Sequence, residues 1–312
     1  MDQVEKRGLL ISVGGSLSVG TAGLVFAVIT ESQAILLDGL FNLTYFIVGL
    51  FTLKVAKLVQ QGDDEYFPAG YLFFEPLING VKGMLILGIS LMALWDAGRA
   101  LFSGGRTISA GVAVIYGLIA SLVCWGVALV LRKKAAGSNS PLLKTDAAGW
   151  IINAAISTAT LIAFVSIVLL EKSSFSAVVP YMDPLLVVLV GAITLHVPVR
   201  MAWGALMELV NRSPSLEIRS TVQDAVEQTL ADVPKQELQV RVLQPGRTRL
   251  VFVHVILATD AVVSVEEMDG LRDQLQRVLF ELHSTTQLDV LFSKNPKWAS
   301  PFGTVTESTG SD

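Results

Sequence analysis

The residues best suited to chemistry are a few oxygen-bearing side chains in stretches that are otherwise apolar. Asp38 interrupts one apolar run, and Asn42 follows four residues later, so on a helix both side chains project from one face. Asn153 lies in another apolar run, two helical turns after Asp146. Carboxylate and amide oxygens are ligands for hard cations. These four side chains on two helices therefore predict a site that could converge on a cation.

Each of these groups also has a structural interpretation. An asparagine in a membrane helix commonly bonds to a neighbouring helix, and this alternative stays open for Asn42 and for Asn153. For Asp38 the cation-binding interpretation is favoured, because an unpaired carboxylate is costly to bury in lipid. Lys82, in a further apolar run, is interpreted as a fixed counter-ion of Asp38 or of Glu75 rather than as a transport residue.

The other potential ligands give weaker signals. Cys124 is the only cysteine, which excludes a disulfide framework and a cysteine-based metal cluster, and we interpret it as packing in the core or toward lipid. His196 lies within an apolar run and is either a proton carrier or a packed residue bonded to a carbonyl. His254 and His283 have no second histidine nearby in the sequence.

Composition indicates where these residues lie. Of the 312 residues, 52% are hydrophobic and 16% are charged, whereas a soluble protein carries roughly 25% charged residues. Six apolar runs approach the ~20 residues that cross a bilayer. We therefore expect a membrane domain of six helices over 1–208, all α-helical, with a water-soluble domain after it. The expected spans are about 8–30, 32–53, 73–98, 108–131, 147–170 and 183–207.

The loops between these runs predict the orientation. Lys and Arg residues concentrate in the loops on one side, which the positive-inside rule assigns to the cytoplasm. Both termini are therefore expected in the cytoplasm, in a bacterial plasma membrane. The net charge of −4 argues against a nucleic-acid partner. The residues on the predicted cytoplasmic side are Lys6, Arg7, Lys54, Lys57, Arg132, Lys133, Lys134, Lys144, Arg200 and Arg212.

The soluble part predicts a small α+β domain over 209–296. Apolar residues recur at helical spacing over 215–231. Two β-rich segments then flank Pro245-Gly246, a turn signal, and form a hairpin. Ser264 and Glu267 make a capping box that opens a helix, and a last strand is expected at 288–292. The order is αββαβ, and the Ser, Thr and Gly-rich residues 297–312 are expected to be disordered.

In this order, the segments resemble the cation diffusion facilitator family. The resemblance covers the chain from about Leu9 to Pro296. It implies six transmembrane helices followed by a cytoplasmic, ferredoxin-like αββαβ domain, in homodimers that exchange a divalent metal for protons. The segments that carry it are SQAILLDGLFNL at 32–43, DEYFPAGYLFFE at 64–75, KTDAAGWIIN at 144–153, DPLLVVLV at 183–190 and PGRTRLVFVHVIL at 245–257.

The chain departs from the family pattern at several ligand positions. The second-helix motif D-x-x-x-D here ends in Asn42, and the fifth-helix motif, H-x-x-x-D or D-x-x-x-D, reads Gly149 and Asn153. Usual histidines of the cytoplasmic loop and of the soluble domain are replaced, so accessory metal sites there are not expected. Glu75 and Asp64 are retained and are given structural roles. The replacing residues are Phe67, Tyr71, Met268 and Phe292.

Together these observations predict a secondary transporter that exports a divalent cation of the zinc, cobalt, cadmium, manganese or iron class, by proton antiport. The metal is a substrate, and no cofactor is expected. Oxygen-only ligands favour manganese or magnesium over zinc. Two alternatives stay open: a non-transporting structural or regulatory relative with a decayed metal site, and a transporter of a monovalent cation. An enzyme is not expected, because the sequence has no catalytic motif.

Overall fold

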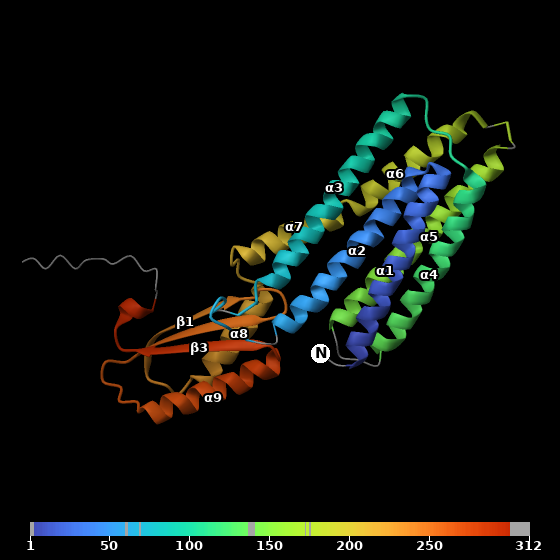
Figure 1. Ribbon diagram of the computed structural model, residues 1–312. Coiled ribbons are helices and arrows are strands. Elements are labelled where there is room, and N and C mark those ends of the chain that lie inside the picture. Colours follow the sequence, from blue (N-terminus) through green and yellow to red (C-terminus); the bar gives the residue numbers. More distant parts are fainter. Residues whose placement is uncertain are drawn as a thin grey trace, which may run out of the picture. The chain divides into compact units, whose positions relative to one another are not determined.

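The computed structural model describes residues 3–59, 62–68, 70–136, 141–171, 173–174 and 176–299. The chain divides into two compact units, one made of Met1–Gln60 with Ile78–Gly204 and the other of Gln61–Leu77 with Ala205–Asp312. Figure 1 labels most of the elements. In chain order they are α1 (Gln3–Thr30), α2 (Gln33–Leu58), α3 (Phe74–Phe102), α4 (Ala110–Ala136), α5 (Pro141–Glu171), η1 (Ser176–Val178), α6 (Val179–Thr194), α7 (His196–Leu209), α8 (Leu216–Thr229), β1 (Lys235–Leu243), β2 (Arg249–Leu257), α9 (Val265–Leu282), β3 (Thr286–Ser293) and η2 (Pro296–Trp298).

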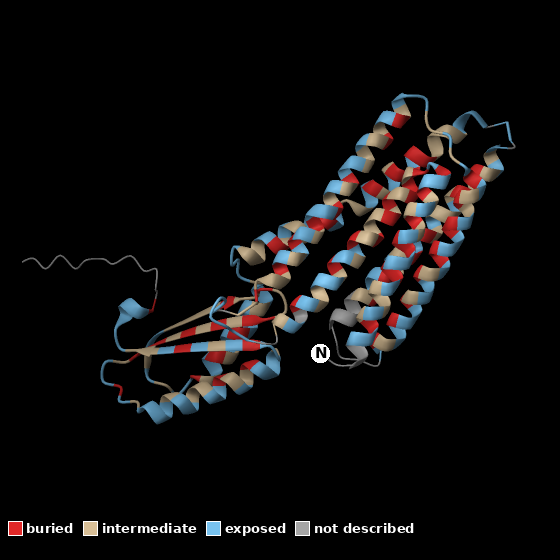
Figure 2. Cartoon of the chain, in the orientation of Figure 1, coloured by how far each residue is buried: buried red, intermediate tan, exposed pale blue. Residues whose placement is uncertain are grey.

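Six helical segments among the described residues are long and apolar enough to cross a membrane, which confirms the predicted six-helix domain. Helices α1 to α5 supply five of them, and α6 with α7 supplies the sixth, over Ser176–Leu209. Large apolar side chains such as Val28, Met92 and Leu169 are exposed, and Figure 2 shows exposed positions along these helices. Such an outward-facing apolar surface suits lipid rather than water.

The sixth span differs from the predicted helix that begins at Asp183. Its first α-helix, α6, begins at Val179, with Pro180 rather than Pro184 in the first turn, and the span is interrupted at Leu195. Pro198 explains the interruption. Its missing N–H cannot bond the carbonyl of Thr194, and its ring crowds that carbonyl.

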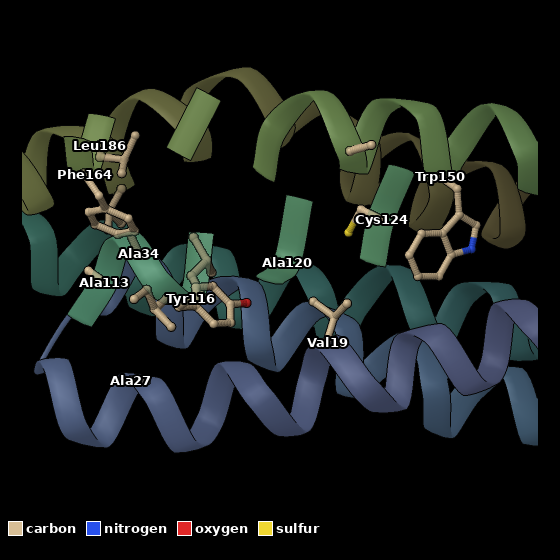
Figure 3. Close-up of a cluster of buried hydrophobic side chains, with 14 of the residues drawn as sticks. Val19, Ala27, Ala34, Ala113, Tyr116, Ala120, Cys124, Trp150, Phe164 and Leu186 are labelled. Carbon is tan, nitrogen blue, oxygen red and sulfur yellow. The ribbon is translucent and has the colours of Figure 1, made fainter. Parts of the chain in front are cut away.

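Helices α1 and α2 approach closely where both carry glycine. A Cβ added at Gly23 would lie 2.5 Å from the Cα of Gly39. No side chain larger than hydrogen fits at such a crossing, which is typical of tightly packed membrane helices. The contact places the α2 segment around Gly39 against α1, and the Tyr116 hydroxyl of α4 lies 3.1 Å from the Cβ built at Gly23. Around it lies a buried apolar cluster that includes Val19, Tyr116 and Phe164 (Figure 3).

The second unit contains a three-stranded sheet in the order β1-β2-β3, with β1 and β2 antiparallel and β2 and β3 parallel. The αββαβ order is confirmed, with β3 starting two residues earlier than predicted. Residues of α8, α9 and the sheet share one apolar core, among them Val226, Val253 and Leu275. The capping box at Ser264 is present.

The predicted domain boundaries at residues 208 and 296 stay predictions. Lys297 and Trp298 form the end of η2. The rest of the predicted disordered tail, from residue 300, lies outside the described residues.

Candidate cation site

Asp38 is held by two neutral hydrogen-bond donors from two helices. Its Oδ2 accepts a hydrogen bond of 2.5 Å from the hydroxyl of Tyr116 on α4. Its Oδ1 accepts one of 3.1 Å from the amide Nδ2 of Asn42, one turn further along α2. The Asn42 side chain is buried, with 2% of its surface exposed. No cationic side chain forms an ion pair with Asp38 among the described residues.

The start of α2 is fixed by a second buried carboxylate. Asp183, only 1% exposed, accepts a hydrogen bond of 2.5 Å from the hydroxyl of Ser32, the N-cap of α2. It also accepts bonds from the backbone N–H groups of Gln33 and Ala34. A carboxylate there satisfies N–H groups that have no partner within the helix. Asp183 and the glycine crossing together fix the part of α2 that carries Asp38.

The polar cluster continues from α2 to α5 and back to α4. The Nδ2 of Asn153 lies 3.5 Å from the Oδ1 of Asn42 and 3.5 Å from the Sγ of Cys124. The Sγ of Cys124 lies 3.6 Å from the hydroxyl of Ser157. The structure therefore brings Asp38, Asn42 and Asn153 together and adds side chains from α4. We call Asp38, Asn42, Tyr116, Cys124, Asn153 and Ser157 the polar cluster.

Three members of this cluster were missed from the sequence. Tyr116, Cys124 and Ser157 are of types that also pack in apolar helices, and Cys124 was interpreted as packing alone. The available signal is spacing: Tyr116 and Cys124 are eight residues apart on α4, and Asn153 and Ser157 are four apart on α5. Each pair therefore shares a helix face. Figure 3 shows Tyr116 and Cys124 with Ala120 between them.

Asp146 and Lys82 belong to a separate group. The Asp146 carboxylate is hydrogen-bonded by Ser12, and its Oδ2 has no hydrogen-bond partner among the described residues. The Lys82 ammonium lies 4.0 Å from the centroid of the Tyr45 ring, a cation–π contact, and interacts electrostatically with Asp146. The structure thus places Lys82 with Tyr45 and Asp146, and not with Asp38 or Glu75.

Gly149 occupies a position where the family pattern has a ligand side chain. A Cβ built on it would meet no atom within 4 Å. Packing therefore does not demand glycine here. Among the residues that the structure describes, no three His, Cys, Asp or Glu side chains gather into a metal-binding group. A cation in the polar cluster would thus depend on Asp38 and on neutral or sulfur ligands.

Glu75 lies in the second unit and is engaged by a cation. Its Oε1 accepts a hydrogen bond of 2.5 Å from the Nε of Arg247, and its Oε2 accepts one of 2.9 Å from the backbone N–H of Arg247. Glu208 accepts a bond of 2.9 Å from the N–H of Gly246 in the same turn. Gly246 has φ +60, and a Cβ there would overlap Glu75. Glu75 is thus a structural anchor for the β1–β2 turn.

Asp64 organises the loop before α3. It accepts hydrogen bonds from the hydroxyl of Tyr71 and from the backbone N–H groups of Phe67 and Tyr66. These bonds, that of Tyr71 foremost, lower the pKa of Asp64 below its usual value, because they stabilise the charged carboxylate. The ring centroids of Phe67 and Tyr71 lie 4.7 Å apart. Where the family pattern has histidines, this chain has an aromatic contact.

His254, in the second unit, has a backbone partner. The Nδ1 of His254 on β2 lies 3.2 Å from the carbonyl oxygen of Ala299. His196 lies where the sixth span is interrupted, with its Nδ1 2.8 Å from the carbonyl oxygen of Ile193. His196 therefore has the carbonyl contact of one of the two alternatives, but its side chain is exposed rather than packed.

Comparison with known proteins decides the class of this molecule. A family model described as the cation efflux transmembrane domain matches residues 9–210. The chain belongs to the cation efflux family. It is therefore an integral membrane protein of a family of transporters, as the six candidate spans also indicate.

Two curated relatives from Bacillus subtilis (strain 168) are similar to this cation efflux protein. It is 22% identical over 292 residues to the uncharacterized transporter YdbO, and the match covers 91% of this chain and 94% of YdbO. It is also 27% identical over 104 residues to the manganese efflux system protein MneS. That match covers 33% of this chain and 36% of MneS.

Proposed function

We propose that this protein exports a divalent metal cation from the cytoplasm in exchange for protons, and that Asp38 carries both. The observation that supports this is the state of Asp38: it lies within a membrane span and is held by a hydroxyl and an amide. Neutral donors stabilise a carboxylate without cancelling its charge. The carboxylate can therefore attract a cation, whereas one paired with arginine is already neutralised.

The same arrangement suits alternation between a metal and a proton. A cation that binds Asp38 replaces the hydrogen bonds from Tyr116 and Asn42, and Asn42 can then offer its amide oxygen as a ligand. When the cation leaves, a proton can occupy the carboxylate instead, because a charged group in lipid is costly. Binding of the two is mutually exclusive, which is what antiport requires.

Manganese is the substrate that we would test first. Carboxylate and amide oxygens suit manganese, and MneS, with which this chain shares a partial match, is described as a manganese efflux protein. We further propose that both termini lie in the cytoplasm of a bacterial cell and that two copies form a homodimer. Light scattering of the detergent-purified protein tests the dimer, and a monomer mass at micromolar concentration would contradict it.

A second candidate function is a membrane relative that binds a cation weakly or transports none. Gly149 favours it, since a ligand position of the family here has no side chain and lies in open space. A transporter of a monovalent cation is a variant of this alternative, because one carboxylate balances one positive charge. The set of ions that the protein transports distinguishes both alternatives from the main proposal.

The decisive experiment measures proton-driven flux of Mn²⁺, Zn²⁺, Mg²⁺ and Na⁺ in proteoliposomes. We expect Mn²⁺ flux that needs a proton gradient and is lost in Asp38→Asn. Glu171→Gln, which removes an exposed carboxylate at the end of α5, is the matched control and should transport normally. Size-exclusion profiles check folding. Full flux in a well-folded Asp38→Asn protein would exclude the assignment, and flux of Na⁺ alone would support the monovalent alternative.

A further inference from the structure

Cys124 is positioned as part of the polar cluster rather than as packing. Its side chain is fully buried, with 0% of its surface exposed. The sulfur lies 3.5 Å from the Asn153 amide and 3.6 Å from the Ser157 hydroxyl, and Asn153 in turn meets Asn42. The path of contacts from the thiol to the Asp38 carboxylate thus passes through two side-chain amides, those of Asn153 and Asn42. An apolar packing role would not require that both neighbours of the sulfur be polar.

The polar cluster needs a second negative charge to balance a divalent cation. A divalent cation in a medium of low dielectric constant is best neutralised by two negative charges. Asp38 supplies one, and Asn42, Asn153 and Ser157 are neutral. Asp146 lies in the group with Lys82, where their charges offset each other. Among the described members of the polar cluster, Cys124 is the group that most readily becomes anionic when a metal binds, since the thiolate is the ligand form.

Family membership, established independently, makes a cation the expected occupant of the membrane domain. We propose that Cys124 is a ligand of the transported cation and that its thiolate restricts the substrate to transition-metal ions and their d¹⁰ relatives over Mg²⁺ and Ca²⁺. This inference rests on the proposed function and adds a sulfur ligand to it. The metal–sulfur bond forms as the S–H bond breaks, and the proton leaves to water. Ligand deprotonation of this kind accompanies metal binding generally.

The neutral side chains can complete the coordination without new elements. Asn42 and Asn153 now direct their Nδ2 groups at Asp38, Asn42 and Cys124. A half-turn of each amide would present its carbonyl oxygen instead, since the two ends of an amide are equal in size. The resulting set is one carboxylate, one thiolate and two amide oxygens. Soft thiolate selects against Mg²⁺ and Ca²⁺, which prefer oxygen throughout.

The chain offers a direct spectroscopic test, because Cys124 is its only cysteine. Co²⁺ is added to the detergent-purified full-length protein, and the sulfur-to-cobalt charge-transfer absorption is recorded. We expect this band in the wild type, its loss in Cys124→Ser, and its retention in Ser121→Ala, which changes a neighbouring buried residue of α4. Absence of the band in the wild type would overturn the inference, so the test does not depend on the folding of any variant.

Transport gives a second and independent measurement. The loss of even an outer partner of a metal ligand costs about 10–100-fold in affinity. We therefore expect Cys124→Ser to raise the KM for Co²⁺ and Cd²⁺ by about tenfold or more, with a smaller change for Mn²⁺. Unchanged ion preference in Cys124→Ser, together with loss of flux in Asp38→Asn, would overturn the sulfur ligand and leave the proposed function standing. Full flux in Asp38→Asn would instead remove the proposed function.

Discussion

Asp38 and Glu75 are both carboxylates at helix positions that the family pattern retains, yet their surroundings differ in one decisive respect. Asp38 accepts hydrogen bonds from the hydroxyl of Tyr116 and the side-chain amide of Asn42. Glu75 accepts hydrogen bonds from the guanidinium Nε and from the backbone N–H of Arg247. A carboxylate with neutral partners keeps its charge available to an incoming ion, whereas one bonded to a guanidinium N–H and to a backbone N–H of the same arginine is committed to structure. The identity of the partners therefore separates function from architecture better than burial does.

The largest expected effect comes from removing the charge of Asp38. In Asp38→Asn we expect Mn²⁺ flux to fall by about 100-fold or more, because the main Coulombic attraction for the ion is lost. Thermal stability should change little, since neutral partners can bond to an amide. Proteoliposome flux and the melting curve of the same preparation measure both quantities. A variant that loses flux only because it unfolds would contradict this account of Asp38.

A smaller effect tests the group of Lys82 and Asp146. In Asp146→Asn the Lys82 ammonium stays in the membrane with Tyr45 as its one remaining partner among the described residues, so we expect a loss of about 2–3 kcal/mol in stability. Adding Lys82→Met should restore most of it. Their double-mutant cycle should give a coupling of about 1 kcal/mol or more.

The matched control for that cycle pairs Lys82→Met with Asp38→Asn. The effects of these two changes should add, because Lys82 lies with Tyr45 and Asp146 and not with Asp38. Melting curves in detergent, followed by size-exclusion chromatography, measure all six proteins. Strong coupling between Lys82 and Asp38 would instead support Lys82 as the counter-ion of Asp38, as the sequence predicted, and would contradict its grouping with Asp146.

Glu75→Gln reverses the pattern expected for Asp38. The side chains of Glu75 and Arg247 are 12% and 34% exposed, and we expect a loss of about 1–2 kcal/mol in stability. Mn²⁺ flux should stay within about threefold of the wild type, which corresponds to less than 1 kcal/mol. Asp269→Asn, which breaks the exposed pair with Arg272, is the control, with a loss below about 0.5 kcal/mol. Equal losses in the two variants would contradict a special role for Glu75.

The smallest effect concerns Asp64. Its pKa is lowered in the folded protein, so its contribution is complete above the unfolded pKa of about 3.9 and is lost as pH falls through the lower folded pKa. We expect hydrogen exchange in the Asp64 loop, corrected for the intrinsic rate, to rise below about pH 4. Asp64→Asn should show fast exchange at all pH values, and Asp63→Asn should behave as the wild type. A loop whose protection is independent of pH would show that Asp64 contributes nothing.

The parts of the site that could be predicted are those set by local spacing. Asp38 and Asn42 share a helix face because they are four residues apart, and no tertiary information is needed for that. Asn153 was selected as a polar side chain in another apolar run, two helical turns after Asp146. Tyr116 and Cys124 could not be chosen, because which face of α4 meets α2 depends on helix rotation and packing. A tyrosine or cysteine in an apolar run also resembles an ordinary packing residue.

The fold was predictable for a related reason. Apolar length determines the spans, and alternation and turn residues determine the hairpin, so both are readable over short windows. The interruption at Leu195 was overlooked because Pro198 lies inside an apolar run that is long enough for a helix. The partner of Glu75 also could not be predicted from the sequence. Arg247 is 172 residues away, and no sequence period connects the two.

The interruption at Leu195 has a mechanical consequence. Bending a continuous helix in lipid breaks backbone hydrogen bonds that no water replaces. At Pro198 that bond is absent from the start, so α6 and α7 can change their mutual angle at little further cost. Interrupted helices are common in secondary transporters, in which parts of the molecule rock against one another to expose a site to alternate sides. We therefore expect the sixth span to bend more easily at Leu195 than an uninterrupted helix would, because Pro198 has already removed one of its backbone hydrogen bonds.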